Sequence, residues 1–286
     1  MAGGVLPSIV AATRGGSARS TEVRFAGHNA RMRRFALLAV TMLMPLRALA
    51  LDSRVVHEGD VDYRVVTVDL RADALDLYWL DANGAAYGSI EALRQGGESD
   101  GRTLAFATNA GIYDRSNRPL GLTIGAGKTL RPLNTTKPRG SSGNFGMQPN
   151  GVFYVDRHGH AGVARTDAWR ALAIDARVAT QSGPMLVVGG EINPSFVEDS
   201  DSRKWRGGVC APAPDKAVFA VSIAPVTFHA FARLFRDTLG CRDALFLDGT
   251  LSQIYTASDG YSGAPDVMVK PYAGMLAVFA GTPDGR

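Results

Sequence analysis

Short stretches of alternating or continuous apolar residues run through the chain from residue 63 to residue 279. Residues 63–70 alternate with the period of two that is typical of a strand. Short apolar runs bounded by Gly, Pro, Asn or Asp indicate further buried strands. We predict these strands at residues 75–80, 103–108, 120–124, 129–133, 152–155, 161–164, 178–180, 185–188, 217–223, 244–247 and 275–279.

Turn residues between these runs predict hairpins. Residues 71–73 would join the strands at 63–70 and 75–80. Gly125-Ala126-Gly127-Lys128 would join the next pair, and residues 156–160 a third.

Helical periodicity is convincing in only one place, residues 228–239. Phe228, Phe231 and Phe235 lie on one apolar face with two leucines. Thr227 is placed to cap the start of this helix and Gly240 its end. A shorter helix is predicted at residues 89–95, with Ser89 as its N-cap. Many short strands with few helices predict an α+β fold of mixed, mostly antiparallel sheets in a single domain, because a repeated strand–helix–strand pattern is missing.

The N-terminal residues have the composition of an export signal. Met32-Arg33-Arg34 opens a basic region, an apolar run follows at residues 35–46, and Ala48-Leu49-Ala50 is a small-residue cleavage pattern. The apolar run is too short to span a bilayer. We therefore expect residues 1–50 to be a leader with a signal peptide and residues 51–286 to be a periplasmic or secreted domain without a stable membrane span; a retained N-terminal anchor is the alternative.

Charge argues against a nucleic-acid partner. The whole chain carries +4, but seven arginines and one glutamate among residues 1–50 contribute +6, which leaves −2 for residues 51–286. The basic character therefore belongs to the leader. Cys210 and Cys241, the two cysteines, permit a disulfide in an exported protein. Because each lies beside an apolar strand, two buried small apolar residues are the favoured interpretation.

One strand ends in a feature that suggests a site. The apolar residues 244–247 stop at Asp248, and Gly249 and Thr250 follow, with Ser252 and Gln253 next along the chain. A carboxylate at the end of a buried strand has a rigid mount, and Gly249 allows a turn or a close ligand approach. The alternative is that Asp248 caps the turn that follows it.

Polar clusters also follow or precede several other strands, and a scaffold can direct such clusters at one cleft. The standard serine-hydrolase, P-loop and zinc-protease motifs are missing. The available groups are carboxylates, amides, hydroxyls and guanidinium, which suit a sugar or a phosphate. The clusters, in chain order, are residues 109–114, 144–145, 149–151, 181–184 and 205–209, in addition to the strand end at Asp248.

The order of these clusters resembles the phosphodiester glycosidase family over residues 103–280. The series runs from Asn109-Ala110-Gly111-Ile112-Tyr113 through Gln181-Ser182-Gly183-Pro184 to Leu247-Asp248-Gly249. Lysosomal members have Asp-Gly-Gly-x-Ser, whereas this chain has Thr250 at the third position. The resemblance implies a hydrolase that cleaves the glycosyl bond of a sugar-1-phosphodiester.

The resemblance also implies roles for individual residues. Asp248 would be the nucleophile or base, with Asp114 as second choice, and Arg206 would hold the phosphate. The substrate-binding positions would be Asn109, Gly111, Tyr113, Asn150, Gly151, Ser182, Gly183, Gly249, Ser252 and Gln253.

Two other functions use the same residues. A non-catalytic envelope protein that binds a glycan or phosphoglycan would need the same amides, glycines and arginine. A metal-dependent hydrolase could hold Ca²⁺ with Asp114, Asp248 and Glu191, but no spacing requires it. We therefore predict no cofactor and no metal site.

Overall fold

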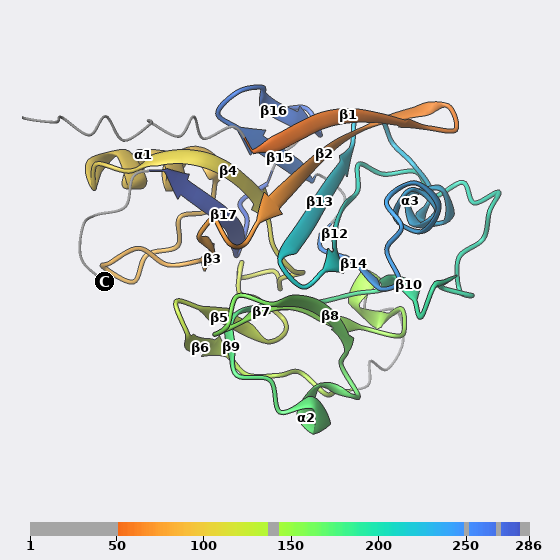
Figure 1. Cartoon of the computed structure of the whole chain (residues 1–286), viewed down its shortest axis with the longest axis horizontal. Coiled ribbons are helices and arrows are strands. Elements are labelled where there is room, and N and C mark those ends of the chain that lie inside the picture. The colour runs from red at the N-terminus through yellow and green to blue at the C-terminus, as the bar shows by residue number, and fades with distance from the viewer. Residues whose placement is uncertain (1–50, 137–142, 249–251, 267–269, 281–286) are drawn as a thin grey trace, which may run out of the picture. The chain divides into compact units, whose positions relative to one another are not determined.

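The computed structural model describes residues 51–136, 143–248, 252–266 and 270–280, which belong to one compact unit. Within these residues every strand pairing is antiparallel, and the strands form three sheets (Figure 1). The predicted α+β fold with mostly antiparallel strands and few helices is confirmed. Residues 1–50, on which the leader and signal-peptide prediction rests, lie outside the described residues.

The first sheet carries the strand that leads to Asp248. Its described strands, in spatial order, are β1 (Asp52–Glu58), β2 (Val61–Asp69), β13 (Lys216–Ser222), β12 (Gly207–Ala213), β14 (Ala244–Phe246), β10 (Met185–Val188) and β11 (Glu191–Ile192). β2 is buried on both faces, because Tyr63 and Val65 point to one apolar cluster while Val66 and Val68 point to another.

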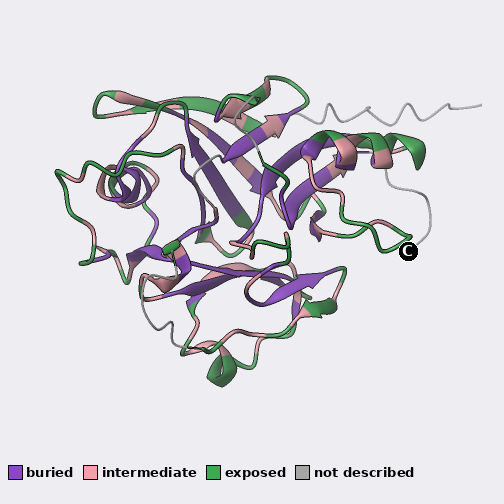
Figure 2. Cartoon of the chain, turned by 180° about the vertical axis from the view of Figure 1, so that it is seen from behind, coloured by how far each residue is buried: buried purple, intermediate pink, exposed green. Residues whose placement is uncertain are grey.

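The second and third sheets complete the core with the first. The second contains β16 (Gly260–Gly263), β15 (Gln253–Thr256), β4 (Thr103–Asn109), β17 (Met275–Ala280) and β3 (Leu75–Tyr78). The third contains β6 (Lys128–Arg131), β5 (Thr123–Gly125), β9 (Ala176–Ser182), β7 (Gly151–Asp156) and β8 (Ala161–Arg165). The Phe219 ring of the first sheet lies 5.0 Å from the Phe106 ring of the second and 5.8 Å from the Phe153 ring of the third, so all three sheets share one core (Figure 2).

The helices cover sheet faces as their patterns require. α1 (Ile90–Ser99) packs Ile90 and Leu93 on the second sheet, and the Ser89 hydroxyl caps it by accepting from Ala92 N. α3 (Phe228–Arg233) continues as a π-helical turn, Leu234–Thr238, and covers the first sheet. The Thr227 cap is confirmed, and Gly240 follows the turn with a φ of 65°. The short α2 (Trp169–Leu172) was not predicted.

Two sequence predictions about the strands were wrong or incomplete. β2 and β3 do not form a hairpin: β2 pairs with β1 and β13, and β3 pairs with β17. Local alternation identifies each strand but cannot choose its partner, which long-range packing decides. β1, β11, β12, β15 and β16 were missed, because they are short or contain glycines and polar residues that resemble turns. The hairpins β5–β6 and β7–β8 are confirmed.

Cys210 and Cys241 form a disulfide, so the favoured interpretation of two buried apolar residues was wrong. Cys210 lies in β12 and Cys241 follows the π-helical turn, and both are buried. The disulfide therefore links the segment after α3 and its π-helical turn covalently to β12 of the first sheet. Sequence alone could not place two residues 31 positions apart at a Cα–Cα distance of 6.1 Å.

Removal of this disulfide should destabilise the protein. We expect the Cys210→Ala/Cys241→Ala double variant to lose about 3 kcal/mol of unfolding free energy, because the closed loop restricts the unfolded chain. Urea unfolding with and without reductant measures this loss. With reductant, the unfolding free energy of the wild-type protein should equal that of the double variant, which reductant should not change. If the double variant is as stable as the oxidised wild type, the prediction is wrong.

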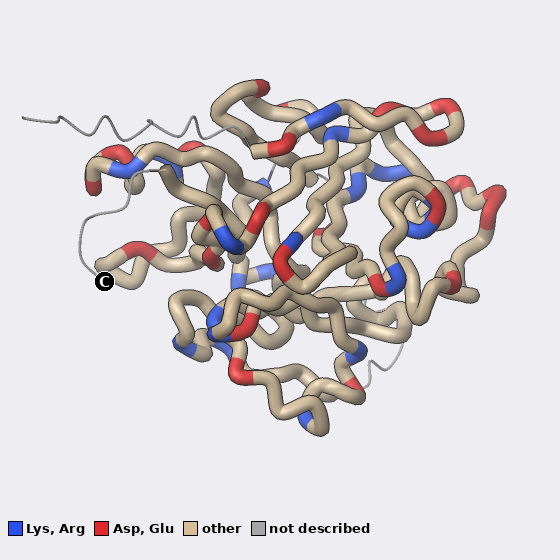
Figure 3. The backbone as a smooth tube through the Cα atoms, in the orientation of Figure 1, with Lys and Arg blue, Asp and Glu red and all other residues tan. Residues whose placement is uncertain are grey.

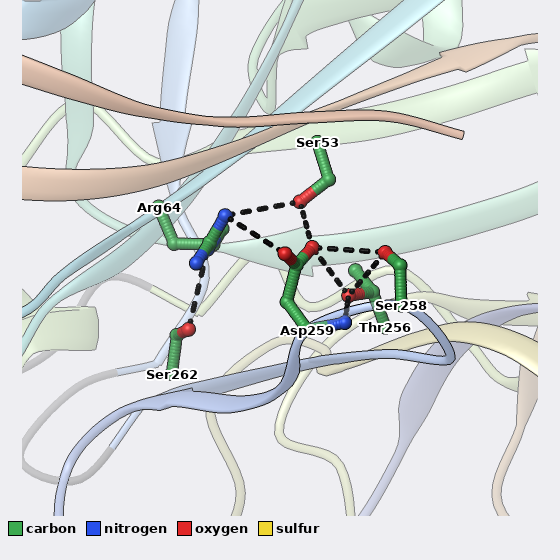
Figure 4. A network of polar contacts seen from close by, with 6 residues as sticks. All are labelled: Ser53, Arg64, Thr256, Ser258, Asp259 and Ser262. Carbon is green, nitrogen blue, oxygen red and sulfur yellow. Dashed lines mark hydrogen bonds and ion pairs between the residues drawn. The ribbon is translucent and has the colours of Figure 1, made fainter. Parts of the chain in front are cut away.

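A polar network fastens the first sheet to the second (Figure 4). The Asp259 carboxylate accepts hydrogen bonds from the hydroxyls of Ser53 (2.7 Å), Thr256 (2.9 Å) and Ser258 (2.9 Å). The Arg64 guanidinium lies 3.5 Å from the other carboxylate oxygen. The Ser53 hydrogen bond is the largest of the causes that lower the pKa of Asp259 below its ordinary value.

Stability should therefore fall in acid through Asp259. Because the pKa of Asp259 is lower in the folded state, its carboxylate contributes fully to the unfolding free energy above the ordinary pKa. This contribution is lost as pH falls through the folded-state pKa. We expect Asp259→Asn to cost about 1 kcal/mol at pH 7, a figure reduced for partial exposure, and less at pH 3, below the ordinary pKa. Urea unfolding at both pH values tests this, with the exposed ion-pair variant Asp175→Asn as control. An equal cost at both pH values would contradict the prediction.

Candidate active site

Asp248 lies two residues beyond β14, on a backbone held by β12. Leu247 N donates to Gly207 O at 3.0 Å, and Gly207 N donates to Asp248 O at 3.4 Å. Leu247 is buried, whereas Asp248 is half-buried. The predicted rigid mount at the rim of the core is therefore present. Gly249, a predicted binding position, lies outside the described residues and stays a prediction.

Ser252 contacts the backbone of Asp248. Its hydroxyl donates to Asp248 O, and the residue is buried. Gly207 makes room for this contact, since a Cβ there would lie 2.9 Å from both Ser252 Cβ and Ser252 Oγ. The Ser252 hydroxyl proton is thus committed to the protein.

Asn109 and Gln253 meet where strands of the second sheet end and begin. Gln253 N donates to Asn109 Oδ1 at 3.1 Å. The Gln253 amide group donates to Ala264 O (2.8 Å) and Asp266 Oδ1 (2.7 Å), and it accepts from Tyr272 Oη (3.1 Å). This network orients the Gln253 side chain, while Asn109 Nδ2 is buried without a partner among the described residues.

Burial and the negative charge of Asp248 raise the pKa values of two nearby phenols, those of Tyr113 and Tyr272. Burial first, and the Asp248 carboxylate second, raise the pKa of Tyr113 to about 12. The same two causes, in the same order, raise the pKa of the buried Tyr272. Both phenols are therefore neutral near pH 7. We call Asp248, Tyr113, Tyr272, Asn109 and Gln253 the Asp248 cluster.

Sequence reasoning missed Tyr272. It precedes β17 and packs with Ile90 and Leu93 in an apolar cluster, so its sequence signal is that of a core aromatic residue. Only the hydrogen bond to Gln253 and the influence of Asp248 identify it as part of the site.

Asp114 anchors a turn. Its Oδ1 accepts from Ser116 N (2.8 Å) and Arg118 N (3.1 Å), and its Oδ2 lies 3.5 Å from Arg118 Nε. The Arg118 backbone hydrogen bond is the largest cause that lowers the pKa of Asp114. The turn holds the loop that carries Tyr113, which forms an isolated bridge with Pro119.

Arg206 precedes β12 and is 1% exposed. Nε donates to Val226 O and one Nη2 hydrogen to Ser202 O, both at 2.9 Å, and the guanidinium carbon lies 3.6 Å from the centre of the Phe228 ring. Burial lowers the pKa of Arg206 to about 10. No carboxylate among the described residues pairs with it, and three of its N–H groups have no acceptor among them.

The other predicted positions gather beside the third sheet. Gly111 N donates to Thr180 Oγ1 at 3.1 Å, and a Cβ on Gly111 would lie 2.5 Å from Gln181 O. Gly151 pairs with Ser182 across β7 and β9, and Ser182 Oγ donates to Leu247 O. The Ser182 contact connects these positions to the residue before Asp248.

A cavity of about 380 Å³ opens beside Asn150, and its lining consists of residues 134–136, 148–150 and 165–167. We call it the Asn150 cavity. Asn150 is 5% exposed, and its Nδ2 donates to Phe145 O at 2.9 Å. A Cβ on Gly183 would lie 1.8 Å from Asn150 Oδ1, so this close approach requires glycine.

The described residues contain neither a metal-binding cluster nor a helix that could span a membrane. Lys, Arg, Asp and Glu are interspersed (Figure 3), and no group of three or more His, Cys, Asp or Glu side chains in the described part of the chain is arranged to hold a metal ion. No helix in that part is long and apolar enough to cross a membrane.

Comparison with known proteins gives one family and several relatives. The model of the phosphodiester glycosidase family matches residues 102–279. Uncharacterized protein YigE of Escherichia coli (strain K12) is 36% identical over 241 residues, which are 84% of this chain and 91% of the relative.

Two solved structures share the fold. The catalytic domain of zebrafish N-acetylglucosamine-1-phosphodiester alpha-N-acetylglucosaminidase, auto-inhibited by its pro-peptide, has a TM-score of 0.56 and 17% identity, with 82% of this chain and 84% of that chain covered. A hypothetical protein from Synechocystis has a TM-score of 0.50 and 15% identity, with 80% and 61% covered.

Proposed function

Because the chain belongs to the phosphodiester glycosidase family, as its sequence resemblance predicted, we propose that it is a hydrolase that cleaves the glycosyl bond of a sugar-1-phosphodiester in an exported glycan or glycoconjugate. The observation that carries the proposal is the Asp248 cluster: a carboxylate on a rigid strand end beside two neutral phenols and oriented amides.

The chemistry of the cluster suits a substrate with a good leaving group. The leaving group is a phosphate monoester, which departs as a stabilised anion, so a strong general acid matters less than in ordinary glycosidases. The reaction breaks the bond between the anomeric carbon and the phosphate oxygen, and a water oxygen ends on the sugar. Asp248 would attack the anomeric carbon or take the proton of the attacking water.

Tyr113 suits the role of a neutral hydrogen-bond donor in this site. It is half-buried, and its phenol has no hydrogen-bond partner among the described residues. The Tyr272 phenol instead donates to Gln253 Oε1, because both amide hydrogens of Gln253 are committed to Ala264 and Asp266. Tyr113 would thus contact the substrate, and Tyr272 would orient Gln253.

Arg206 would stabilise the departing phosphate. A buried guanidinium without a carboxylate partner among the described residues is costly unless an anion compensates it. The phosphate oxygens of a bound substrate would supply that anion. Asp114 remains the second choice for the base; its commitment to a turn favours Asp248.

We also propose that the protein is periplasmic or secreted. The composition of residues 32–50 motivates this proposal, and the Cys210–Cys241 disulfide supports it because such bonds persist in oxidising compartments. Fractionation of expressing cells, followed by determination of the mature N-terminus, tests it. An uncleaved chain in the cytoplasm would contradict it.

A panel of UDP-N-acetylglucosamine and p-nitrophenyl sugar phosphodiesters tests the catalytic proposal, with free sugar as the measured product. We expect release from at least one member, with no loss of rate in a metal chelator. Saturable binding of every member without product would instead favour the non-catalytic glycan-binding protein, which the same amides and glycines would serve.

A further inference from the structure

We propose that residues 194–203, which we call the strap, form a hinged cover that must open before phosphate or any other solute can reach Arg206. The strap lies between β11 and β12 and runs beside α3 as an extended loop (Figure 1). This inference rests on the proposed function only for the identity of the solute, the departing phosphate. It goes further by naming the segment of the chain that controls access to this arginine.

Protein atoms enclose Arg206, which is 1% exposed. The guanidinium carbon lies 3.6 Å from the centre of the Phe228 ring and 5.8 Å from that of the Phe246 ring. Backbone oxygens of Ser202 and Val226 accept hydrogen bonds from the guanidinium. A phosphate oxygen binds a guanidinium N–H at a distance of about 2.7–2.9 Å. Because water itself hardly reaches this side chain, part of the enclosure must move before phosphate can bind.

The exposed member of this enclosure is Ser202, which belongs to the strap. Val226, Phe228 and Phe246 are instead buried in the apolar cluster of the first sheet. None of the ten residues of the strap is buried (Figure 2). Segments with few buried apolar contacts open locally at a low cost in free energy. We therefore expect the strap to open while the apolar cluster stays packed.

Firm anchors lie at both ends of the strap. Asn193 precedes it and is 1% exposed, and its Nδ2 donates to Met185 O at 2.9 Å. Lys204 follows it and exchanges backbone hydrogen bonds of 3.0 and 2.9 Å with Val226. Hinged loops absorb their change of backbone angles in a few residues beside such anchors. The strap can therefore swing away from Arg206 without unfolding of the first sheet.

Stacking of Phe196 on Phe228 holds the strap closed. The centres of the two rings lie 4.9 Å apart, with an angle of 9° between the ring planes, and Phe196 is half-buried. Val197, the next side chain of the strap, is 66% exposed. The Arg206 guanidinium lies over the same Phe228 ring. Separation of the two rings would therefore release the strap and take Ser202 O away from the guanidinium.

Phenylglyoxal, which reacts with accessible guanidinium groups, tests this inference on the full chain. Mass spectrometry would follow the modification of Arg206, with the exposed Arg170 of α2 as the internal reference. We expect Phe196→Ala to speed modification of Arg206 about tenfold, because the variant loses the stack that keeps the strap closed and the open fraction rises. Val197→Ala is the matched control and should react as the wild type does.

Leu93→Ala separates opening of the strap from unfolding of the whole domain. Leu93 is buried in the apolar cluster between α1 and the second sheet, so this variant lowers the unfolding free energy without touching the strap. Urea unfolding of Leu93→Ala and Phe196→Ala measures the loss in each. If Arg206 reacts through the open strap, Leu93→Ala should leave its modification rate unchanged.

Three results would overturn the inference. If Arg206 of the wild type reacts as fast as Arg170, it has no cover. If Phe196→Ala leaves the rate at Arg206 unchanged, the stack does not hold the strap closed. If Leu93→Ala and Phe196→Ala speed the reaction in proportion to their losses of unfolding free energy, Arg206 is reached by global unfolding and not by opening of the strap.

Inorganic phosphate distinguishes failure of this inference from failure of the proposed function. In Phe196→Ala we expect phosphate to slow the modification of Arg206, because it would occupy the guanidinium. If Phe196→Ala exposes Arg206 and phosphate gives no protection, the strap remains and the phosphate role of Arg206 is lost. If a phosphodiester is cleaved while Arg206 is equally unreactive in the wild type and in Phe196→Ala, the hydrolase remains and the strap is lost.

Discussion

Replacement of Asp248 by asparagine is expected to lower sugar release from a cleavable phosphodiester by at least about a thousandfold, because an amide can neither attack the anomeric carbon nor accept a proton from water. The fold should survive, since asparagine has nearly the same shape and the backbone hydrogen bonds of Leu247 N and Asp248 O are unchanged by the substitution. The measurements are kcat and KM for the variant, with urea unfolding to verify its stability.

A second measurement on the same variant does not depend on catalysis. The Asp248 charge contributes to the raised pKa of Tyr113, after burial. Loss of that charge should therefore move the Tyr113 titration downward from about 12, which ultraviolet difference spectra follow. An unchanged titration would mean that Asp248 does not face this phenol.

Asp114→Asn is the matched control for Asp248→Asn. Asparagine can still accept the backbone hydrogen bonds of Ser116 and Arg118, so we expect the turn to persist and activity to remain near that of the wild type. Full activity in Asp248→Asn together with loss of activity in Asp114→Asn would exchange the two roles.

Replacement of Arg206 by alanine is expected to cost about 4 kcal/mol of unfolding free energy, because it removes two charge-assisted hydrogen bonds and the stack on Phe228 and leaves a void. Desolvation of the guanidinium, which lowers the pKa of Arg206, offsets part of what these contacts contribute. The exposed Arg203→Ala is the matched control and should change stability by no more than about 0.5 kcal/mol. Urea unfolding of both variants decides the comparison; equal effects would contradict it.

A phosphate role for Arg206 needs a folded variant. Arg206→Lys keeps the charge but loses the planar fork that holds Val226 O and Ser202 O. If Arg206 stabilises the leaving phosphate, this variant should lose more kcat/KM for phosphodiesters than for p-nitrophenyl glycosides, which lack phosphate. Parallel losses on both substrate types would leave Arg206 a structural role only.

Much of the fold was predictable because its signals are local. Alternation located β2, apolar runs located β4, β7, β13 and β17, and Ser89 and Thr227 marked the starts of two helices. The pairing of β2 with β13 was not predictable, because their residues are about 150 positions apart along the chain and no local pattern specifies that partner. The disulfide failed as a prediction for the same reason.

For the candidate site, too, the positions of single residues were predictable from the sequence, whereas their contacts were not. The position of Asp248 at the end of a buried strand, and the asparagines and glycines at other strand ends, followed from apolar runs that stop at small polar residues. Their grouping did not: Gln253 reaches Asn109 across 144 positions, and Tyr272 joins them from a segment whose pattern is that of a core. The roles of these residues stay predictions.

The sequence by itself determined the family, the α+β class and the local mount of Asp248, because short-range periodicity and an ordered series of motifs carry that information. The tertiary structure alone decided that the Asp114 carboxylate is committed to a turn, that Arg206 stacks on Phe228 and that Asn150 Oδ1 is buried without a partner in the described part of the chain. Each of these three features depends on contacts between particular atoms. Such contacts are fixed only when the three sheets pack closely together in the folded chain.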